Sequence, residues 1–224
     1  MNILVADDHA LFRFGICQVL RRIEQTAQIV EAGSWPDAIH QAEGGSFDLI
    51  LTDLMMPDGT PEEALTALRA TQPKTPIVVV SMIEEAAMIR GVFRSGASGF
   101  IPKSVEPREF IEALRVVLSG GIYVPASAFA AIVTDAEASA DEAHGPNPLS
   151  QRLTDRQKAT LFEMARGKSN KEIARSLNIT EATVKMHVAA IMRALKASNR
   201  TQAVIIAVRE GLLPQSMLPL SISE

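Results

Sequence analysis

Three carboxylates near the start of the sequence could form one metal-binding crevice. Asp7 and Asp8 follow an apolar run at residues 2–6, and Asp53 follows another at residues 49–52. If these runs are neighbouring strands of one sheet, the three side chains point into one pocket, where their charges repel. A hard dication such as Mg2+ or Mn2+ relieves that repulsion and keeps water ligands for phosphate. It can also hold a phosphoryl donor beside a carboxylate nucleophile.

Two further residues stand where phosphoryl chemistry would use them. Ser81 ends an apolar run at residues 77–81 and can donate a hydrogen bond to a phosphoryl oxygen. Lys103 follows a run at residues 99–101 and offers a positive point charge. Singly these residues carry little weight, because an Asp-Asp pair after a strand is usually a helix N-cap. Five of them on the ends of four strands favour a built site. His9 is interpreted as an exposed loop residue, with a contact to the pocket as the alternative.

An α/β domain would position these residues. Residues 1–120 alternate between short apolar runs and helix-length amphipathic segments, and the runs 49–51 and 77–80 are apolar without alternation, as strands covered on both faces are. The pattern predicts a doubly wound, five-stranded parallel sheet with its site at the carboxyl ends of the strands. The expected strands are 2–6, 28–32, 49–52, 77–81 and 99–101, and the expected helices are 10–25, 35–44, 61–70, 84–95 and 107–119.

The charge balance divides the chain into two parts. Residues 1–149 carry 10 Lys+Arg and 20 Asp+Glu, a net charge of −10, whereas residues 150–224 carry 12 and 6, a net charge of +6. The basic part is a candidate for binding nucleic acid. Small, acidic and Pro- or Gly-bearing residues at 134–150 indicate a linker. The expected organisation is an α/β domain at 1–120, a linker with a possible helix at 121–148, an all-helical domain at 149–212 and a tail at 213–224.

The amino-acid composition indicates in which cellular compartment the protein is expected. Apolar residues make up 47% of the chain, enough to build real cores. The longest apolar stretches are far shorter than a membrane span, and we expect no signal peptide before the first strand. The single cysteine, Cys17, excludes an internal disulfide and a multi-cysteine metal site. A cytoplasmic protein with no membrane partner is therefore expected.

The basic part contains only helical patterns, at 154–166, 170–177, 181–195 and 201–210. Thr154 and Thr180 are the expected N-caps, and Gly167 and Asn178 are the expected C-terminal stops. A short helix, a tight turn at Asn178-Ile179 and a second helix form the geometry that places a helix in the major groove of DNA. The residues expected to seat the second helix against the first are Ala182, Val184, Val188, Ile191 and Leu195.

Residues 1–120 resemble the receiver domain of two-component response regulators. The matching pieces are Asp7-Asp8, Asp53 with Met56-Pro57 after it, Ser81, and the run Gly96-Ala97-Ser98-Gly99-Phe100-Ile101-Pro102-Lys103. The resemblance implies a flavodoxin-like fold in which Asp53 accepts a phosphoryl group from a sensor histidine kinase. It implies further that Asp7, Asp8, Asp53 and the backbone carbonyl of Met55 hold the metal ion.

The same resemblance implies a switch. Ser81 would move onto the phosphoryl group, and the ring of Phe100 would fill the vacated space. Lys103 would bind the phosphoryl group. The charge added at Asp53 would then bias a two-state element of the domain.

Residues 150–212 resemble the LuxR-type helix-turn-helix of the NarL/FixJ group. The matching pieces are Leu153-Thr154, the run from Gly167 to Ala174, Thr183-Val184-Lys185 with His187, and Asn199-Arg200-Thr201. The resemblance implies a motif at about Ser169 to Val188, a recognition helix at 181–195, and a helix at 201–210 that pairs subunits. The implied DNA-binding residues are Lys171, Thr183, Lys185, Met186, His187, Ala189 and Arg200, and the implied dimer residues are Thr201, Val204, Ile205 and Val208.

Within that set, Lys185 would contact bases or phosphate, and Lys171, Thr183, His187 and Arg200 would mostly contact the DNA backbone. Ala189 stands where some members of the family carry a basic residue. His187 has a capping or packing role as an equal alternative. For Lys168, Lys171 and Lys185, the alternative to DNA binding is that they simply form a solvent-exposed face.

Together these features predict a response regulator whose phosphorylation controls sequence-specific DNA binding and transcription. The expected partners are a sensor histidine kinase, double-stranded DNA, RNA polymerase and, on activation, a second copy of the chain. The protein is not expected to be an enzyme beyond self-phosphorylation from small donors and self-dephosphorylation. One alternative is a DNA-binding regulator that works independently of phosphorylation. Another is an aspartyl-phosphate phosphatase, in which a second Asp would stand where this chain has Met55.

Overall fold

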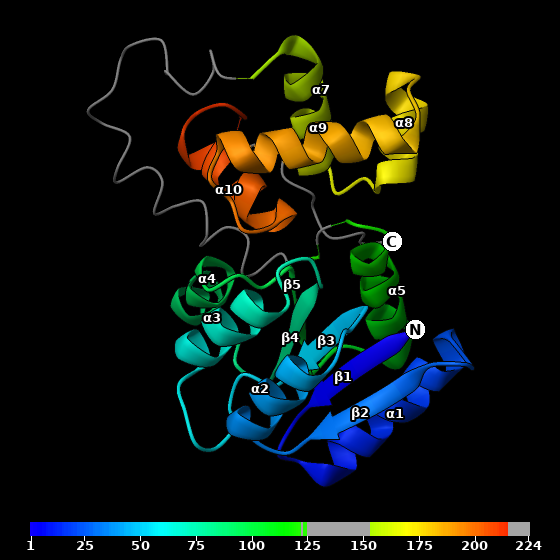
Figure 1. Ribbon diagram of the computed structural model, residues 1–224, viewed down its shortest axis with the longest axis vertical. Helices are drawn as coiled ribbons and strands as arrows, with labels where there is room; N and C mark the ends of the chain where they lie inside the picture. The colour runs from blue at the N-terminus through cyan, green and yellow to red at the C-terminus, as the bar shows by residue number, and fades with distance from the viewer. Residues whose placement is uncertain (122, 125–152, 215–224) are drawn as a thin grey trace.

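The N-terminal domain is built on a five-stranded parallel sheet (Figure 1). The computed structural model describes residues 1–121, 123–124 and 153–214. Most of the predicted linker (121–148) and of the predicted tail (213–224) lies outside these described residues. The strands are β1 (Asn2–Ala6), β2 (Gln28–Ala32), β3 (Leu49–Thr52), β4 (Ile77–Ser81) and β5 (Gly99–Pro102), in the spatial order β2-β1-β3-β4-β5. The predicted parallel sheet is confirmed, and the order reverses between β1 and β3.

Helices cover both faces of the sheet, as the unbroken apolar strands predicted. They are α1 (Ala10–Ile23), α2 (Trp35–Gly44), α3 (Pro61–Thr71), α4 (Ala86–Arg94) and α5 (Pro107–Leu118). Successive strand residues enter opposite cores: Ile3 packs with α1 and α5, whereas Leu4 packs with α2, α3 and α4. Both side chains are fully buried. A strand that is buried on both faces does not alternate between apolar and polar residues, which is why these strands are continuous apolar runs in the sequence.

Local caps set most helix ends. The hydroxyl of Ser34 accepts a hydrogen bond from the N–H of Asp37 at the start of α2, and Thr60 does the same for Glu63 at the start of α3. α1 ends two residues before the predicted end, because Glu24 is extended and its carboxylate accepts hydrogen bonds from Thr26. Such end effects depend on cap geometry, which hydrophobic periodicity does not report.

The C-terminal domain is all-helical, with α7 (Asp155–Ala165), α8 (Asn170–Leu177), α9 (Glu181–Ala194) and α10 (Arg200–Arg209). Leu161, Ile173 and Val184 are buried in its core. The prediction that Ala182 seats α9 against α8 is wrong, because its side chain is exposed. Ala182 lies two positions from Val184, which turns it about 200° around the helix and away from the core. No helix in the described part of the chain has the length and apolarity needed to cross a bilayer.

The two domains touch at the amino-terminal edge of the sheet. The start of α10 contacts the loop between α4 and β5, at residues 96–98. The end of α5 lies near the start of α8. Figure 1 shows the helical domain stacked on this edge. The left-handed Gly120 (φ +80°) permits the approach, because a Cβ there would lie 3.3 Å from Asn170 Nδ2. The carboxyl edge, where the acidic residues were predicted, faces away from this contact.

Candidate functional site

The acidic crevice forms where the strand order reverses. β1 pairs with β3 in parallel, with Ala6 opposite Thr52, so Asp7 and Asp53 follow at the same edge of the sheet. The backbone N–H of Asp53 donates to the carbonyl of Ala6 at 2.8 Å, which fixes the end of β3 against β1. The expectation that these two strands are neighbours, on which the pocket depended, is confirmed.

Lys103 neutralises the floor of the crevice. Its Nζ lies 2.8 Å from both Asp7 Oδ2 and Asp53 Oδ2, and the three side chains are only 7%, 2% and 4% exposed. Burial alone lowers the pKa of Lys103, but the hydrogen bonds and charges of Asp53 and Asp7 outweigh burial and raise that pKa above its ordinary value. The ring of Phe12, with its centroid 4.4 Å from Nζ, covers the ammonium group. Lys103 is therefore a charged counter-ion at neutral pH.

Asp8 and His9 form the open rim of the crevice. His9 Nδ1 lies 2.8 Å from Asp8 Oδ1 and 3.4 Å from Asp7 Oδ1, although the His9 side chain is 67% exposed. Both sequence interpretations of His9 therefore hold, since it is an exposed loop residue that also touches the pocket. Ligand atoms of Asp7, Asp8, His9 and Asp53 all lie within 4.8 Å of one another. The hard carboxylate oxygens of this donor set fit Mg2+. The sequence pattern predicted the three carboxylates but not the imidazole of His9 beside them.

The predicted switch residues lie close to the crevice along the sheet. Ser81 ends β4, is buried, and accepts a hydrogen bond at its Oγ from the N–H of Ile83. Phe100 lies on β5, and its ring is fully buried in the core with α4. The backbone N–H of Lys103 donates to the carbonyl of Ser81 at 2.8 Å, which joins the two strand ends. The side chain of Met55, two residues after Asp53, is 54% exposed.

The predicted helix-turn-helix has well-defined ends. Ser169 and Glu172 form a reciprocal capping box at the start of α8, and Thr180 caps α9 by accepting from the N–H of Thr183. Asn178 ends α8 in the left-handed conformation (φ 51°), as the sequence predicted for this stop. α8 and α9 are therefore separated by a tight turn at Asn178-Ile179, the geometry expected of a helix-turn-helix.

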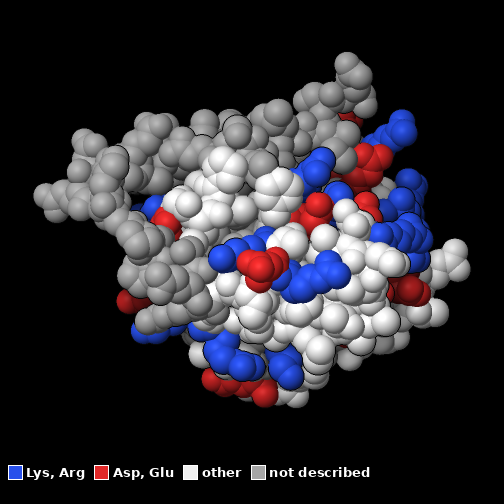
Figure 2. All heavy atoms as spheres, turned by 90° about the horizontal axis from the view of Figure 1, so that it is seen from above, with Lys and Arg blue, Asp and Glu red and all other residues white. Residues whose placement is uncertain are grey.

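α9 presents an open face to solvent. Lys185, Met186 and Ala189 are exposed there, and Lys171 is exposed on α8, whereas Thr183 and His187 are half-buried. Lys185 pairs with Glu181 one turn earlier at 3.3 Å, an exposed pair that contributes little stability. Figure 2, which looks down on the helical domain, shows Lys and Arg side chains interspersed with acidic ones. On this face the basic side chains are therefore mixed with acidic ones.

Comparison with protein families decides what these two domains are. The model of the response regulator receiver domain matches residues 3–115, and the model of the bacterial regulatory proteins of the luxR family matches residues 151–207. The chain belongs to the NarL/FixJ-type response regulators. Members of this family are DNA-binding regulators and not classical enzymes.

Individual relatives agree with this assignment over nearly the whole chain. A glycerol metabolism activator of Pseudomonas putida is 36% identical over 92% of this chain and 94% of its own length. The nitrate/nitrite response regulator NarP of Escherichia coli is 30% identical over 93% and 95%. The solved structure of RcsB from Salmonella typhimurium has a TM-score of 0.54 at 24% identity, covering 91% of this chain and 96% of that one, which shows the shared fold alone.

In this response regulator the helix predicted to pair subunits is docked on the receiver. Asn199 Nδ2 donates to the carbonyls of Gly96 (2.8 Å) and Ala97 (3.0 Å), and the hydroxyl of Thr201 donates to the carbonyl of Ser98 (2.7 Å). Of the other predicted dimer residues, Val204 and Val208 are buried and Ile205 is half-buried. The start of α10 is therefore covered by the loop that leads into β5.

Arg200 lies apart from the other predicted DNA-binding residues. It is half-buried at the domain boundary, where Nη1 donates to Asn170 Oδ1 at 3.1 Å and Nη2 donates to the carbonyl of Lys168. Sequence reasoning did not assign a contact between the domains to Asn199. Its partners in the receiver are the backbone carbonyls of Gly96 and Ala97, which leave no side-chain signature in the sequence.

Proposed function

We propose that Asp53 is the phosphoacceptor of this response regulator and that its phosphorylation by a sensor histidine kinase frees α10 for DNA binding as a dimer. The observation that carries the proposal is the position of Asp53. It ends β3 at the reversal of strand order, 2.8 Å from Lys103 Nζ and beside Asp7 and Asp8. A carboxylate oxygen of Asp53 would form the new bond to phosphorus while the P–N bond to the kinase histidine breaks and the imidazole leaves with the electron pair.

The neighbours of Asp53 have separate roles in this proposal. Asp7, Asp8, Asp53 and the backbone carbonyl of Met55 would hold Mg2+ or Mn2+, and the ion supplies positive charge for the phosphoryl oxygens. Lys103 exchanges part of its contact with Asp53 for the phosphoryl group, because it already reaches that carboxylate. Ser81 adds a hydroxyl donor once its Oγ turns from the N–H of Ile83.

The rim of the crevice offers a surface to the kinase. Leu11 and Phe14 on α1 are 86% and 60% exposed, and Met82 beside Ser81 is 70% exposed. Large apolar side chains exposed together around a charged crevice are typical of a protein contact site. We therefore propose that the kinase docks over α1 and Met82 when it presents its phosphohistidine.

Strand β5 would carry the signal to the helical domain. Lys103 follows its carboxyl end in the crevice, Phe100 lies within it, and Ser98 precedes it, bound to Thr201 of α10. A shift of β5 that follows the phosphoryl group would weaken the three hydrogen bonds that hold α10. The freed helix, with Thr201, Val204, Ile205 and Val208, would pair two copies of the chain on two half-sites about one helical turn apart.

Lys185 would then read DNA from α9. Its exposure, with that of Met186 and Ala189, leaves this face open for the major groove, while Lys171, Thr183, His187 and Arg200 would contact the DNA backbone. A cytoplasmic location and a contact with RNA polymerase complete the proposal, since transcription control requires both DNA and the polymerase.

The phosphoacceptor is tested by labelling the full chain with acetyl phosphate and Mg2+. We expect Asp53→Asn to abolish labelling, because the amide is a poor nucleophile. Asp58→Asn is the matched control, since Asp58 is exposed on the next loop in a left-handed conformation that Asn tolerates. Undiminished labelling of Asp53→Asn would refute the assignment. Equal DNA affinity with and without acetyl phosphate would favour a regulator that is independent of phosphorylation.

The recognition helix is tested by DNA affinity at matched salt. We expect Lys185→Ala to weaken binding roughly tenfold and to reduce the salt dependence by about one phosphate contact. Lys158→Ala on α7 removes the same charge from another exposed position and serves as the control. Equal affinities of the two variants would contradict the placement of α9 in the groove.

A further inference from the structure

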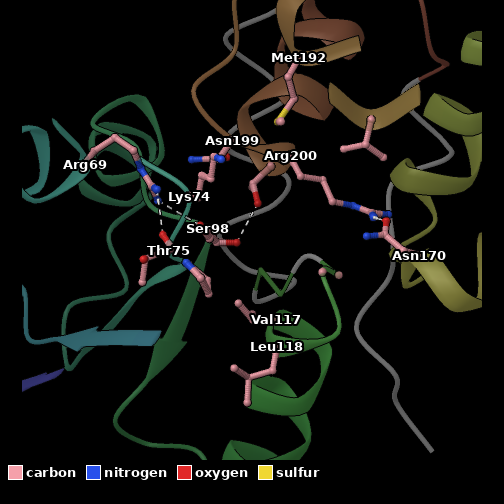
Figure 3. Close-up of a pocket in the computed structure, with 15 residues that line it drawn as sticks. Arg69, Lys74, Thr75, Ser98, Val117, Leu118, Asn170, Met192, Asn199 and Arg200 are labelled. Atoms are coloured by element: carbon pink, nitrogen blue, oxygen red, sulfur yellow. Dashed lines mark hydrogen bonds between the residues drawn. The ribbon is translucent and has the colours of Figure 1, made fainter. Parts of the chain in front are cut away.

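A cavity of about 260 Å3 lies between the receiver and the helical domain (Figure 3). The receiver side comes from the end of α3, the loop at residues 74–76, Ser98 and the end of α5, and the other side comes from α8, α9 and α10. The volume exceeds that of one water, roughly 30 Å3, by several times. It lies just below the range of drug-sized sites, roughly 300 Å3 and more. Its size therefore suits an ion or a small metabolite.

Cations from both domains line this cavity. They are Arg69 and Lys74 of the receiver and Arg200 of the helical domain, and none of the described lining residues is acidic. Arg69 donates only to neutral oxygens, including the carbonyls of Gly96 and Thr75. Lys74 is exposed and has no hydrogen bond or ion pair with another described residue. The described lining therefore collects positive charge and contains no carboxylate of its own.

Arg200 holds an unused donor at the cavity. Its two Nη atoms are bonded to Asn170 and Lys168, but its buried Nε has no hydrogen-bond partner among the described residues. Burial lowers the pKa of Arg200 to about 10, and the charge of Glu172 offsets only part of that effect. Burial also lowers the pKa of Arg69 to about 10. Positive charge that is partly removed from water in this way is stabilised when an anion joins it.

Two helix starts add to the positive potential. α8 begins at Asn170 and α10 at Arg200, and both residues line the cavity. The N-terminal end of a helix carries partial positive charge, which the capping carboxylate of Glu172 offsets in part at α8. Figure 3 shows Arg69 extending from the receiver, Arg200 extending from α10 toward Asn170, and Asn199 between the two arginines in this view.

We propose that this cavity binds a small anion that bears carboxylate or phosphate groups and bridges the two domains. Such an anion would accept hydrogen bonds from Arg200 Nε and Lys74 Nζ and would offset the charge of Arg69. Because its partners come from both domains, it favours the docked arrangement over the separated one. This coupling rests on the proposed function, in which docking of α10 limits DNA binding: by linkage, the same anion then lowers the affinity of the unphosphorylated protein for DNA.

Calorimetric titration of the full chain tests the site directly. The probes are inorganic phosphate and citrate, without divalent cations and at constant ionic strength set with NaCl. We expect saturable binding of one of them, and the two titrations separate phosphate from carboxylate chemistry. Lys74→Glu should weaken that binding at least tenfold, because it reverses a charge at the cavity without removing a structural contact. Lys158→Glu makes the same change away from the lining and should bind as the native chain does.

Two outcomes would overturn the site. One is the absence of saturable binding by either probe, and the other is equal binding by the native chain and Lys74→Glu. Arg200→Lys retains the charge but lacks Nε and the two Nη donors, so it should also bind more weakly than the native chain. Asp53→Asn should bind the anion normally, which separates a failure of this site from a failure of the proposed phosphoacceptor.

A mobility-shift titration tests the coupling to DNA. At constant ionic strength the bound probe should weaken DNA binding of the native chain and leave that of Lys74→Glu unchanged. An equal effect on both proteins would show that the anion competes for the DNA-binding surface, and the proposed bridge between the domains would be wrong.

Discussion

The two edges of the receiver sheet carry opposite electrostatic arrangements. At the carboxyl edge, the buried carboxylates of Asp7 and Asp53 share the ammonium group of Lys103. At the amino edge, Arg69 and Arg200 lie against one cavity whose described lining holds no carboxylate. The first site is complete within one domain, whereas the second exists only while two domains touch. A site whose charges balance within one domain is stable without a ligand. A site between domains with excess positive charge depends on the anion that binds there.

The difference shows how each edge could respond to a ligand. A phosphoryl group at the carboxyl edge adds negative charge, so the group competes for Lys103 and disturbs an existing balance. A small anion at the amino edge supplies missing negative charge, so it stabilises an existing contact. β5 connects the edges, because Ser98 precedes the strand and Lys103 follows it. The two ligands should therefore act in opposite directions on the docking of α10.

Replacing the lysine at each edge by methionine gives the largest expected contrast. Lys103→Met leaves the buried Asp7 and Asp53 without their counter-ion, and we expect a loss of about 3 kcal/mol in the free energy of unfolding. Lys74→Met removes an exposed, like-charged neighbour of Arg69, and we expect a change within about 0.5 kcal/mol. Urea unfolding of both variants at pH 7 measures the contrast.

Magnesium sharpens this test, because a dication can replace the missing ammonium charge. Mg2+ should restore more stability to Lys103→Met than it adds to the native chain. Equal losses for the two lysine variants would contradict the distinction between a balanced and an unbalanced edge. Equal losses in the free energy of unfolding would mean that the repulsion between Asp7 and Asp53 is too weak for the charge of Lys103 to stabilise the fold.

Sequence reasoning located the carboxyl edge because local patterns encode it. Asp7, Asp53, Ser81 and Lys103 each stand at or directly after an apolar run, and parallel strands bring such positions to one edge. All five strands lie where periodicity placed them, with β5 one residue longer, at Pro102. The helix caps Thr154 and Thr180 were also predicted, since a cap depends on residues three positions apart.

The amino edge could not be predicted in this way. Asn199 bonds to the carbonyls of Gly96 and Ala97, more than 100 positions away, and a carbonyl is common to every residue. Asn199 also caps α10, so the helix begins at Arg200 and not at Thr201. The sequence pattern can predict the capping role of Asn199, which depends on neighbouring residues, but not its contact with the receiver. The contact between domains depends on a relative placement that no short-range pattern encodes.

Separating the domains should give an intermediate effect. In Asn199→Ser/Thr201→Val, serine still caps α10 but is too short to reach Gly96, and valine keeps the shape of Thr201 without its hydroxyl donor. The loss of three hydrogen bonds to the receiver should increase DNA affinity of the unphosphorylated chain roughly tenfold. Mobility shift at matched salt measures the change.

Thr66→Val provides a matched control for this variant, because Thr66 is an exposed threonine on α3 away from the domain contact. The double variant should also respond less to acetyl phosphate, since its α10 is already released. Unchanged affinity of the double variant would mean that docking of α10 does not limit DNA binding.

Glu172 gives the smallest expected effect and tests the amino edge from the helical side. The N–H of Ser169 donates to its carboxylate at 2.7 Å, as does the Ser169 hydroxyl, and these bonds lower the pKa of Glu172. A carboxylate with a lowered pKa stabilises the fold at pH values above its ordinary value of about 4.5, and that contribution is lost as the pH falls through its folded value. Glu172→Gln should therefore cost about 0.5 kcal/mol at pH 7, and the cost should decrease as the pH falls below the ordinary value of the carboxylate.

The same substitution removes the carboxylate whose charge acts on Arg200. The cavity becomes more cationic, so phosphate or citrate should bind Glu172→Gln roughly threefold more tightly at pH 7. Glu106→Gln is the matched control, because Glu106 precedes α5 without a capping bond from its side chain. If both variants bound the anion alike, the field at Arg200 would not be set by Glu172. The cationic character of the cavity would then have to come from Arg69, Lys74 and the helix starts.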